Sequence, residues 1–166
     1  IGVNEIDGIF HTHAHDDHQS GLSTLLRRDN RMPYYAVPMV RNSVMKKLTA
    51  AMQLPESEFS HLFDVRDLRL DEWNDIEGLE VKPVLSPHPV ETTIFFFRSI
   101  WEGGYRSYAH LADIASFDVL RKMIAPDNAP AGISEAMFER TEKAYLQKAD
   151  IKKIDIGGGL IHGTAA

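Results

Sequence analysis

The chain has 166 residues, of which 43% are hydrophobic and 25% charged, a composition typical of one globular domain with a sizeable core. It has no cysteine, which excludes disulfides, thiolate metal sites and cysteine nucleophiles. The formal net charge of −6 argues against a nucleic-acid partner, and no apolar run is long enough to span a membrane. We therefore expect a cytoplasmic protein that acts on a small molecule.

The first predicted element is a strand at residues 6–12, built on a short apolar run. It leads into the stretch 11–18, which holds four histidines and two aspartates in eight positions. Imidazole and carboxylate are the nitrogen and oxygen ligands that Zn²⁺ and related metals accept. Because residues two apart on a strand point the same way, His13 and His15 are placed to share one metal ion.

Asp17 and His18 are expected in the turn that follows, beside a helix predicted at residues 19–28, where they can reach a second metal ion. The alternative is a polar loop of surface histidines. The number of ligand-type residues at this spacing favours the metal site over that alternative. His11 lies before the pattern and is expected to be structural.

A second strand is predicted at residues 32–37, followed by an amphipathic helix at 38–53 that has proline in its first turn. One more helical turn is expected between 56 and 62, and a polar, turn-rich segment between 64 and 75. His61 is expected to be structural. The long helix should bury Val40, Val44, Leu48 and three methionines, Met39, Met45 and Met52, and should expose Arg41, Lys46 and Lys47.

Three strands are predicted next, at residues 78–85, 92–100 and 105–109, with a glycine hairpin turn between the last two. His88 lies between the first and second of these strands and has proline on both sides. Proline fixes the backbone on either side of the imidazole. The alternative is an ordinary turn residue, but the position of His88 at the end of one strand and before the next favours a metal ligand.

A carboxylate follows the third of these strands at Asp113, where it can bind metal ions. Asp118 is the fallback ligand, although it fits better inside a helix predicted at residues 116–124. His110 either orients a ligand or is an exposed strand residue.

The rest of the chain is predicted as a helix at residues 134–149, capped by Ser134, and a strand at 151–156. Three consecutive glycines, 157–159, then permit another group to approach the backbone closely. They do not match a phosphate-binding loop, because its lysine is absent. His162 follows the glycines. It either has a functional role or is a histidine on a frayed chain end.

The stretch from Thr12 to Leu22 resembles the signature of the metallo-β-lactamase superfamily, His-x-His-x-Asp-His. Members of this superfamily are mostly binuclear hydrolases with an αββα-sandwich fold, so the resemblance implies an α/β (α+β) fold class. It also implies two divalent metal ions, Zn²⁺ first, with Mn²⁺ or Fe as alternatives. The implied ligands of the first ion are His13, His15 and His88, and those of the second are Asp17, His18 and Asp113, with Asp113 bridging the two.

The stretch that begins at His162 resembles the His-x-Thr-Ala sequence of the ribonuclease Z and phosphodiesterase-like branch. The resemblance implies that His162 donates a proton to the leaving group, and that Asp17 orients the attacking hydroxide. The last ligand of the second ion is either His162 itself or a histidine beyond the chain. We expect hydrolysis of a phosphodiester of a small molecule or nucleotide. Hydrolysis of a thioester or lactone, or metal binding without turnover, are the alternatives.

Members of the superfamily place several strands ahead of the signature, and residues 1–7 cannot supply them. We therefore expect residues 1–166 to be a single metallo-β-lactamase-like domain that lacks its N-terminal strands and is truncated at both ends. A missing segment or a second copy in a homodimer would then complete the sheet.

Overall fold

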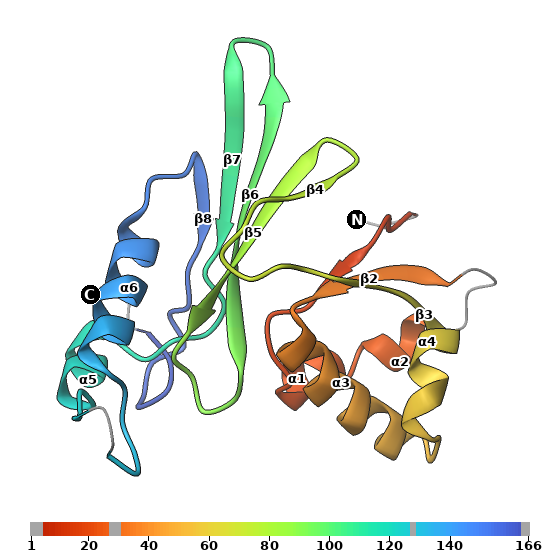
Figure 1. Ribbon diagram of the computed structural model, residues 1–166, viewed down its shortest axis with the longest axis horizontal. Helices are drawn as coiled ribbons and strands as arrows, with labels where there is room; N and C mark the ends of the chain where they lie inside the picture. The colour runs from red at the N-terminus through yellow and green to blue at the C-terminus, as the bar shows by residue number, and fades with distance from the viewer. Residues whose placement is uncertain (1–4, 27–30, 127–128, 164–166) are drawn as a thin grey trace. The chain divides into compact units, whose positions relative to one another are not determined.

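The computed structural model describes residues 5–26, 31–126 and 129–163 of the chain. Its contacts divide the protein into two compact units, residues 1–69 and 70–166, each built on its own β-sheet (Figure 1). The sheets and their helices confirm the mixed α/β class. The single domain over residues 1–166 stays a prediction. None of the described helices is long and apolar enough to cross a membrane.

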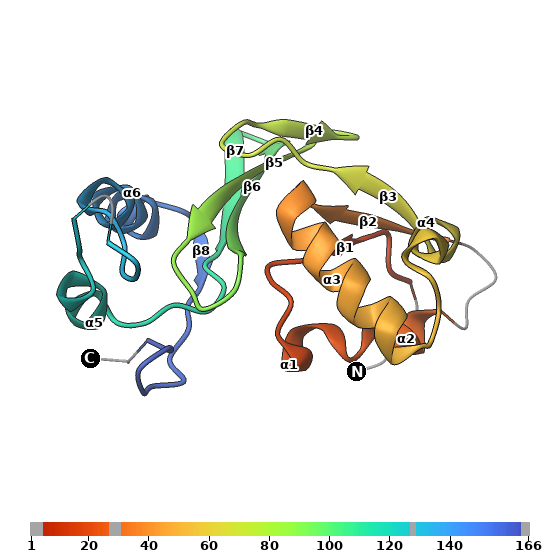
Figure 2. The same ribbon diagram turned by 60° about the horizontal axis from the view of Figure 1, so that its bottom comes forward.

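The first unit is a parallel sheet of three described strands, ordered β1-β2-β3. Parallel neighbours need a crossover connection, and α3 provides it between β2 and β3. Figure 2 shows α3 lying along this sheet. The predicted apolar face of α3 is confirmed, because Val40, Val44 and Leu48 are all buried. The elements are β1 (Ile9–Phe10), α1 (Asp16–Gln19), α2 (Leu22–Leu25), β2 (Met32–Ala36), α3 (Pro38–Ala51), η1 (Glu56–Glu58), α4 (Phe59–Leu62) and β3 (Phe63–Asp67).

Two predictions in this unit were wrong about helices. The helix expected at 19–28 is two short helices, α1 and α2, separated at Ser20 and Gly21, and residues 27–28 lie outside the described part of the chain. Asp17 and His18 therefore lie in α1 and not in a turn. The acidic residues in the first turn of α1 favour a helix that begins at Asp16, because they lie beside the positive end of the helix dipole.

Three further expectations fail for reasons of geometry. Met39 is 42% exposed, because it follows the first residue of α3 on the side away from the buried face. His61 is exposed and its Nδ1 lies 3.3 Å from Glu58, one helical turn earlier, instead of packing among apolar side chains. Strand β3 lies in the segment expected to be turn-rich, since its charged residues occupy the more exposed positions of a strand that pairs with β2.

The second unit is built on β4, β5, β6 and β7, which pair antiparallel in sequence order, and on β8, which pairs parallel with β7. Strands β5, β7 and β8 therefore run in the same direction, and their C-terminal ends lie at the same edge of the sheet. The predicted strand at 151–156 is shorter than expected. The elements are β4 (Asn74–Ile76), β5 (Leu79–Ser86), β6 (Thr92–Trp101), β7 (Gly104–His110), α5 (Phe117–Lys122), α6 (Glu135–Leu146) and β8 (Ile151–Lys153).

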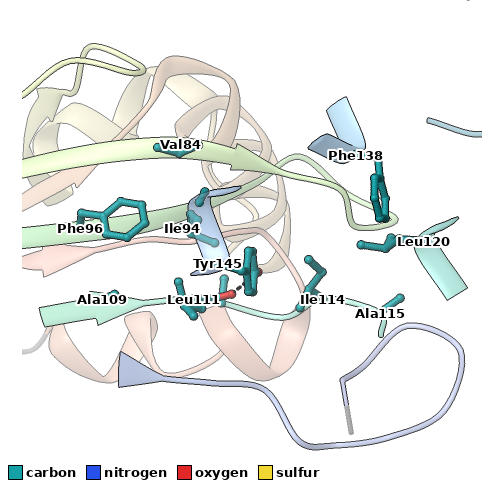
Figure 3. Packing of buried hydrophobic residues seen from close by; sticks show 12 residues of the cluster. Val84, Ile94, Phe96, Ala109, Leu111, Ile114, Ala115, Leu120, Phe138 and Tyr145 are labelled. Carbon is teal, nitrogen blue, oxygen red and sulfur yellow. Dashed lines mark hydrogen bonds between the residues drawn. The ribbon is translucent and has the colours of Figure 1, made fainter. Parts of the chain in front are cut away.

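The core of this unit lies between its sheet and the helices α5 and α6 (Figures 2 and 3). Ser134 caps α6 as predicted, with its Oγ accepting a hydrogen bond from the Met137 N–H at 3.1 Å. Tyr145 of α6 is tied to the sheet edge, because its hydroxyl donates to the Leu111 carbonyl and lies 3.2 Å from Ser86 Oγ. The buried side chains at this interface include Ile94, Phe96, Leu111, Leu120 and Phe138.

A salt bridge between β5 and β6 joins residues that face each other in the strand register, Glu80 and Arg98. The guanidinium donates from Nε to Glu80 Oε2 at 2.7 Å and from Nη2 to Oε1 at 3.1 Å. It also lies over the rings of Trp73 and Tyr105, 3.9 and 4.7 Å from their centroids. The hydrogen bonds from Arg98 hold the pKa of Glu80 below its ordinary value.

The variant Glu80→Gln is therefore expected to lower the free energy of unfolding at neutral pH but not in strong acid. Because the folded state lowers the pKa of Glu80, its carboxylate stabilises the fold above the unfolded-state value and loses that contribution as pH falls through the folded-state pKa. Urea unfolding at neutral pH and below both pKa values measures the difference. Glu77→Gln, in the β4–β5 turn, is the matched control. A loss of equal size at both pH values would contradict this account.

Candidate metal centre

The first group of predicted ligands lies in the loop and short helix after β1. His13 is completely buried, and its Nδ1 lies 2.9 Å from Thr12 Oγ1, a hydrogen bond that fixes the orientation of the ring. The centroid of the His13 ring lies 4.9 Å from that of His15 and 4.1 Å from that of His18. The structure thus brings three predicted imidazole ligands together within the first unit.

Asp17, the fourth predicted residue of this group, lies on α1 next to His18. Its Oδ2 lies 3.5 Å from His18 Nε2, and its side chain is 77% exposed. Asp17 is in none of the groups of close ligand atoms found among the described residues, so its predicted role as a ligand stays a prediction.

His11 has the environment of a structural residue. It is buried, and its ring lies 5.7 Å from that of Tyr34, centroid to centroid. Burial, together with the nearby His18, lowers the pKa of His11 to about 4, so the ring is neutral at physiological pH. This environment agrees with the role expected for His11.

The second group of residues lies at one edge of the five-stranded sheet. His88 follows β5 and Asp113 follows β7, while Asp155 follows β8. Since these three strands run in the same direction, their C-terminal ends deliver the three side chains to the same edge. His162 joins them, with its ring centroid 6.1 Å from that of His88 and its Nδ1 3.8 Å from Asp113 Oδ2.

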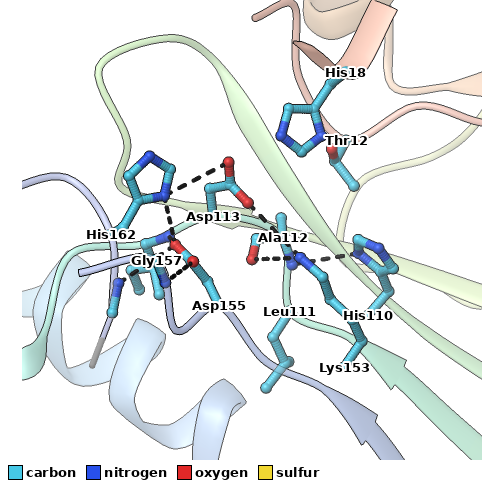
Figure 4. Close-up of polar contacts among 12 residues, drawn as sticks. Thr12, His18, His110, Leu111, Ala112, Asp113, Lys153, Asp155, Gly157 and His162 are labelled. Atoms are coloured by element: carbon cyan, nitrogen blue, oxygen red, sulfur yellow. Dashed lines mark hydrogen bonds and ion pairs between the residues drawn. The ribbon is translucent and has the colours of Figure 1, made fainter. Parts of the chain in front are cut away.

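Asp155 is a site residue that the sequence analysis missed (Figure 4). Its Oδ2 lies 2.8 Å from Nδ1 of His162 and also accepts the backbone N–H groups of Ile114 and Gly163, while Oδ1 accepts that of Gly157. Burial alone would raise the pKa of Asp155, but these hydrogen bonds outweigh it and leave the pKa below its ordinary value. Asp155 is therefore an ionised carboxylate that orients the His162 ring.

The glycines around His162 explain the close backbone approach expected of this segment. A Cβ on Gly163 would lie 2.5 Å from the Asp155 carbonyl oxygen, and one on Gly157 would lie 3.2 Å from the His162 side chain. The Gly158 N–H closes the loop by donating to the Gly163 carbonyl at 2.7 Å. The loop thus packs its backbone tightly around the imidazole. The residues that continue the His-x-Thr-Ala resemblance, 164 and 165, lie outside the described part of the chain.

The turn that presents Asp113 has an unusual backbone. Ala112 has a φ of +48°, a left-handed conformation that favours glycine. Its N–H donates to Nδ1 of His110 at 3.3 Å, so the half-buried His110 supports this turn. Lys153 of β8 holds the other side, with Nζ 3.7 Å from Asp113 Oδ1 (Figure 4). Asp113 itself is 5% exposed.

These residues have the chemistry that a divalent metal ion requires. Within the second unit, Asp113, Asp155 and His162 offer ligand atoms that all lie within 4.8 Å of one another. The fallback residue Asp118 is not among them, because it lies in α5 with its side chain 88% exposed, 3.9 Å from Arg121. The second unit therefore carries a cluster of imidazole and carboxylate groups suited to Zn²⁺ and related ions, and the first unit brings three imidazole rings together.

A mixed α/β fold with such clusters after its strands defines a class of metal-dependent proteins. A profile of the beta-lactamase superfamily domain matches residues 2–155. The chain therefore belongs to the metallo-β-lactamase superfamily. No curated protein sequence matches it significantly.

Solved structures share this fold. An unliganded yeast PDE1 is 18% identical, with a TM-score of 0.53 over 76% of this chain and 37% of its own. A diphosphatase of the PhnP family is 19% identical, with a TM-score of 0.56 over 96% of this chain and 53% of its own. The Rm3 metallo-beta-lactamase is 15% identical, with a TM-score of 0.50 over 89% of this chain and 56% of its own. The chain thus spans about half, or less, of the length of these structures.

Proposed function

We propose that the chain is a binuclear metal-dependent hydrolase that cleaves a phosphodiester of a small molecule or nucleotide. The observation that carries this proposal is the Asp155–His162 pair beside Asp113, because it combines a metal-ligand carboxylate with a histidine whose orientation is fixed. The superfamily resemblance supports the ligand set, which is His13, His15 and His88 for one ion and Asp17, His18 and Asp113 for the other. Divalent ions held there would supply a nucleophile at neutral pH and neutralise the charge that develops on the substrate.

His162 is the proton donor in this proposal. Nδ1 of His162 donates a hydrogen bond to the Asp155 carboxylate. The opposite ring nitrogen, Nε2, is therefore the one that exchanges a proton with the substrate. A phosphodiester loses an alkoxide, which is a poor leaving group until it receives a proton. Asp17, which is exposed beside His18, accepts a hydrogen bond from the attacking water and orients it.

Three observations favour a small phosphodiester among the substrates of this superfamily. Two of the structures with this fold carry the names of a PDE1 and a diphosphatase. The net charge of −6 disfavours a large polyanion such as RNA. The residues between His88 and Asp113 are taken up by β6 and β7, so this stretch does not hold the RNA-binding arm expected there in the ribonuclease Z branch.

A panel of chromogenic substrates tests the proposal. With added Zn²⁺ or Mn²⁺, we expect hydrolysis of bis(4-nitrophenyl) phosphate and of a nucleotide cyclic phosphodiester, and loss of both activities with a chelator. A thioester and a lactone form the other arms of the panel. Hydrolysis of the thioester or lactone alone would contradict the proposed phosphodiester substrate. Metal binding without turnover of any substrate would contradict the proposed enzyme and favour a metal-binding module.

A further inference from the structure

We infer that Lys47 is a positioning residue for the metal-binding loop, and this inference rests on the proposed function. Lys47 lies on α3, 33 positions after Ala14 in the chain, and its Nζ donates to the Ala14 carbonyl at 2.6 Å. It also lies 3.2 Å from Asp16 Oδ1. One ammonium group thus holds both the loop that carries the histidines and the first residue of α1.

The Ala14 carbonyl is an effective point at which to hold this loop. Ala14 is 2% exposed and lies between the predicted ligands His13 and His15. Its C=O belongs to the peptide group that joins Ala14 to His15, and a peptide group is planar. A bond that fixes this plane therefore constrains the backbone at Ala14 and His15, and with it the direction in which the His15 side chain leaves the backbone. Because a buried carbonyl needs a donor, losing Lys47 would also leave this one without its partner.

The other end of the contact is rigid. Val44 and Leu48, which lie on either side of Lys47 in sequence, are buried in the core of the first unit. The helix that carries the ammonium is therefore held by packing, and a ligand-bearing loop tied to such a helix is pre-organised for metal binding. Asp16 is a second contact between Lys47 and the ligand-bearing segment. Its carboxylate is itself held in place, because it also accepts a hydrogen bond from Gln19 Nε2 at 3.3 Å.

This role differs from the plain exposed face that the sequence suggested for Lys47. Its ammonium is engaged by a carbonyl and a carboxylate and is not merely solvated. Arg41 on the same helix forms an ion pair with Asp67 at 3.2 Å. Lys46 is exposed, as expected, and serves as the matched control.

Competition with a chromogenic chelator for Zn²⁺ tests the inference on the folded chain. We expect Lys47→Met to weaken Zn²⁺ affinity by about 10–100-fold, the size typical of residues that orient metal ligands without touching the metal. Lys47→Arg, which keeps a charged donor, should restore most of the affinity, and Lys46→Met should leave it unchanged. Asp16→Asn should have a smaller effect than Lys47→Met, because the bond to Ala14 remains.

Unfolding of the metal-free variants separates positioning from simple stabilisation. A residue that only stabilised the first unit would lower the melting temperature but would not change the Zn²⁺ affinity of protein that is still folded. Unchanged affinity in folded Lys47→Met, or no restoration by Lys47→Arg, would overturn the inference. If Lys47→Met does not fold, Lys47→Ala, which also removes the donor, replaces it, and affinity equal to that of wild type would overturn the inference in the same way. A wild-type chain that binds no Zn²⁺ would contradict the proposed function itself, and this inference with it.

Discussion

His15→Ala is expected to lower the metal content of the chain and to weaken Zn²⁺ affinity by more than roughly 100-fold. That is the largest loss typical of residues that orient metal ligands without touching the metal. The reason is that this variant removes a proposed ligand atom and leaves the rest of the cluster around His13 in place. Metal analysis after dialysis against a defined Zn²⁺ concentration measures the change. His61→Ala, which removes an exposed histidine of α4, is the matched control. Unchanged metal occupancy in His15→Ala would remove His15 from the ligand set.

His162→Ala is expected to lower kcat by about 10²–10⁴-fold, the range typical of losing a general acid. The loss should depend on the leaving group. An alkoxide needs a proton as the bond breaks, so its substrate should lose the most activity. A 4-nitrophenolate leaves without one, and its substrate should lose little. Kinetics on a matched pair of phosphodiesters that differ only in this group measure the contrast, and an equal loss on both would contradict the role of proton donor.

The same variant decides between the two roles left open for His162. A proton donor can be removed without loss of bound metal, whereas removal of the last ligand of the second ion lowers the metal content. Asp155→Asn separates the orientation of the His162 ring from its proton transfer. The amide keeps the shape of the side chain but loses the negative charge of the carboxylate that accepts the hydrogen bond from Nδ1. We expect its kcat to fall in the same direction as that of His162→Ala, by a smaller factor.

Local patterns in the sequence predicted the elements whose burial is regular. Strand β6 follows from its β-branched and aromatic run, and it was expected at 92–100 and is found at Thr92–Trp101. Helix α3 follows from apolar residues at intervals of four. The length of β1 and the break between α1 and α2 do not follow from such patterns, because the pairing and packing of the parallel sheet decide where these short elements end.

The sequence analysis missed the residues whose roles depend on distant partners. Asp155 was read as one position of a strand at 151–156, although a single carboxylate between two isoleucines just before three glycines was a signal that the strand ends there. Lys47 was read as part of a charged helix face, and nothing local to α3 indicates a carbonyl partner 33 positions away. The spacing of histidines and aspartates in the sequence predicted the candidate ligands. The residues that orient those ligands could be identified only from the structure.

The proposed function requires that the predicted imidazole and carboxylate ligands hold a pair of divalent ions. Titration of the metal-free chain with Zn²⁺ in a calorimeter, with the chain shown to be folded by circular dichroism, counts those ions directly. The account predicts saturable binding of two ions per chain in wild type, and weaker binding when Asp113 is replaced by asparagine. A folded chain that binds no Zn²⁺, or one whose binding is the same with and without the Asp113 carboxylate, would contradict it.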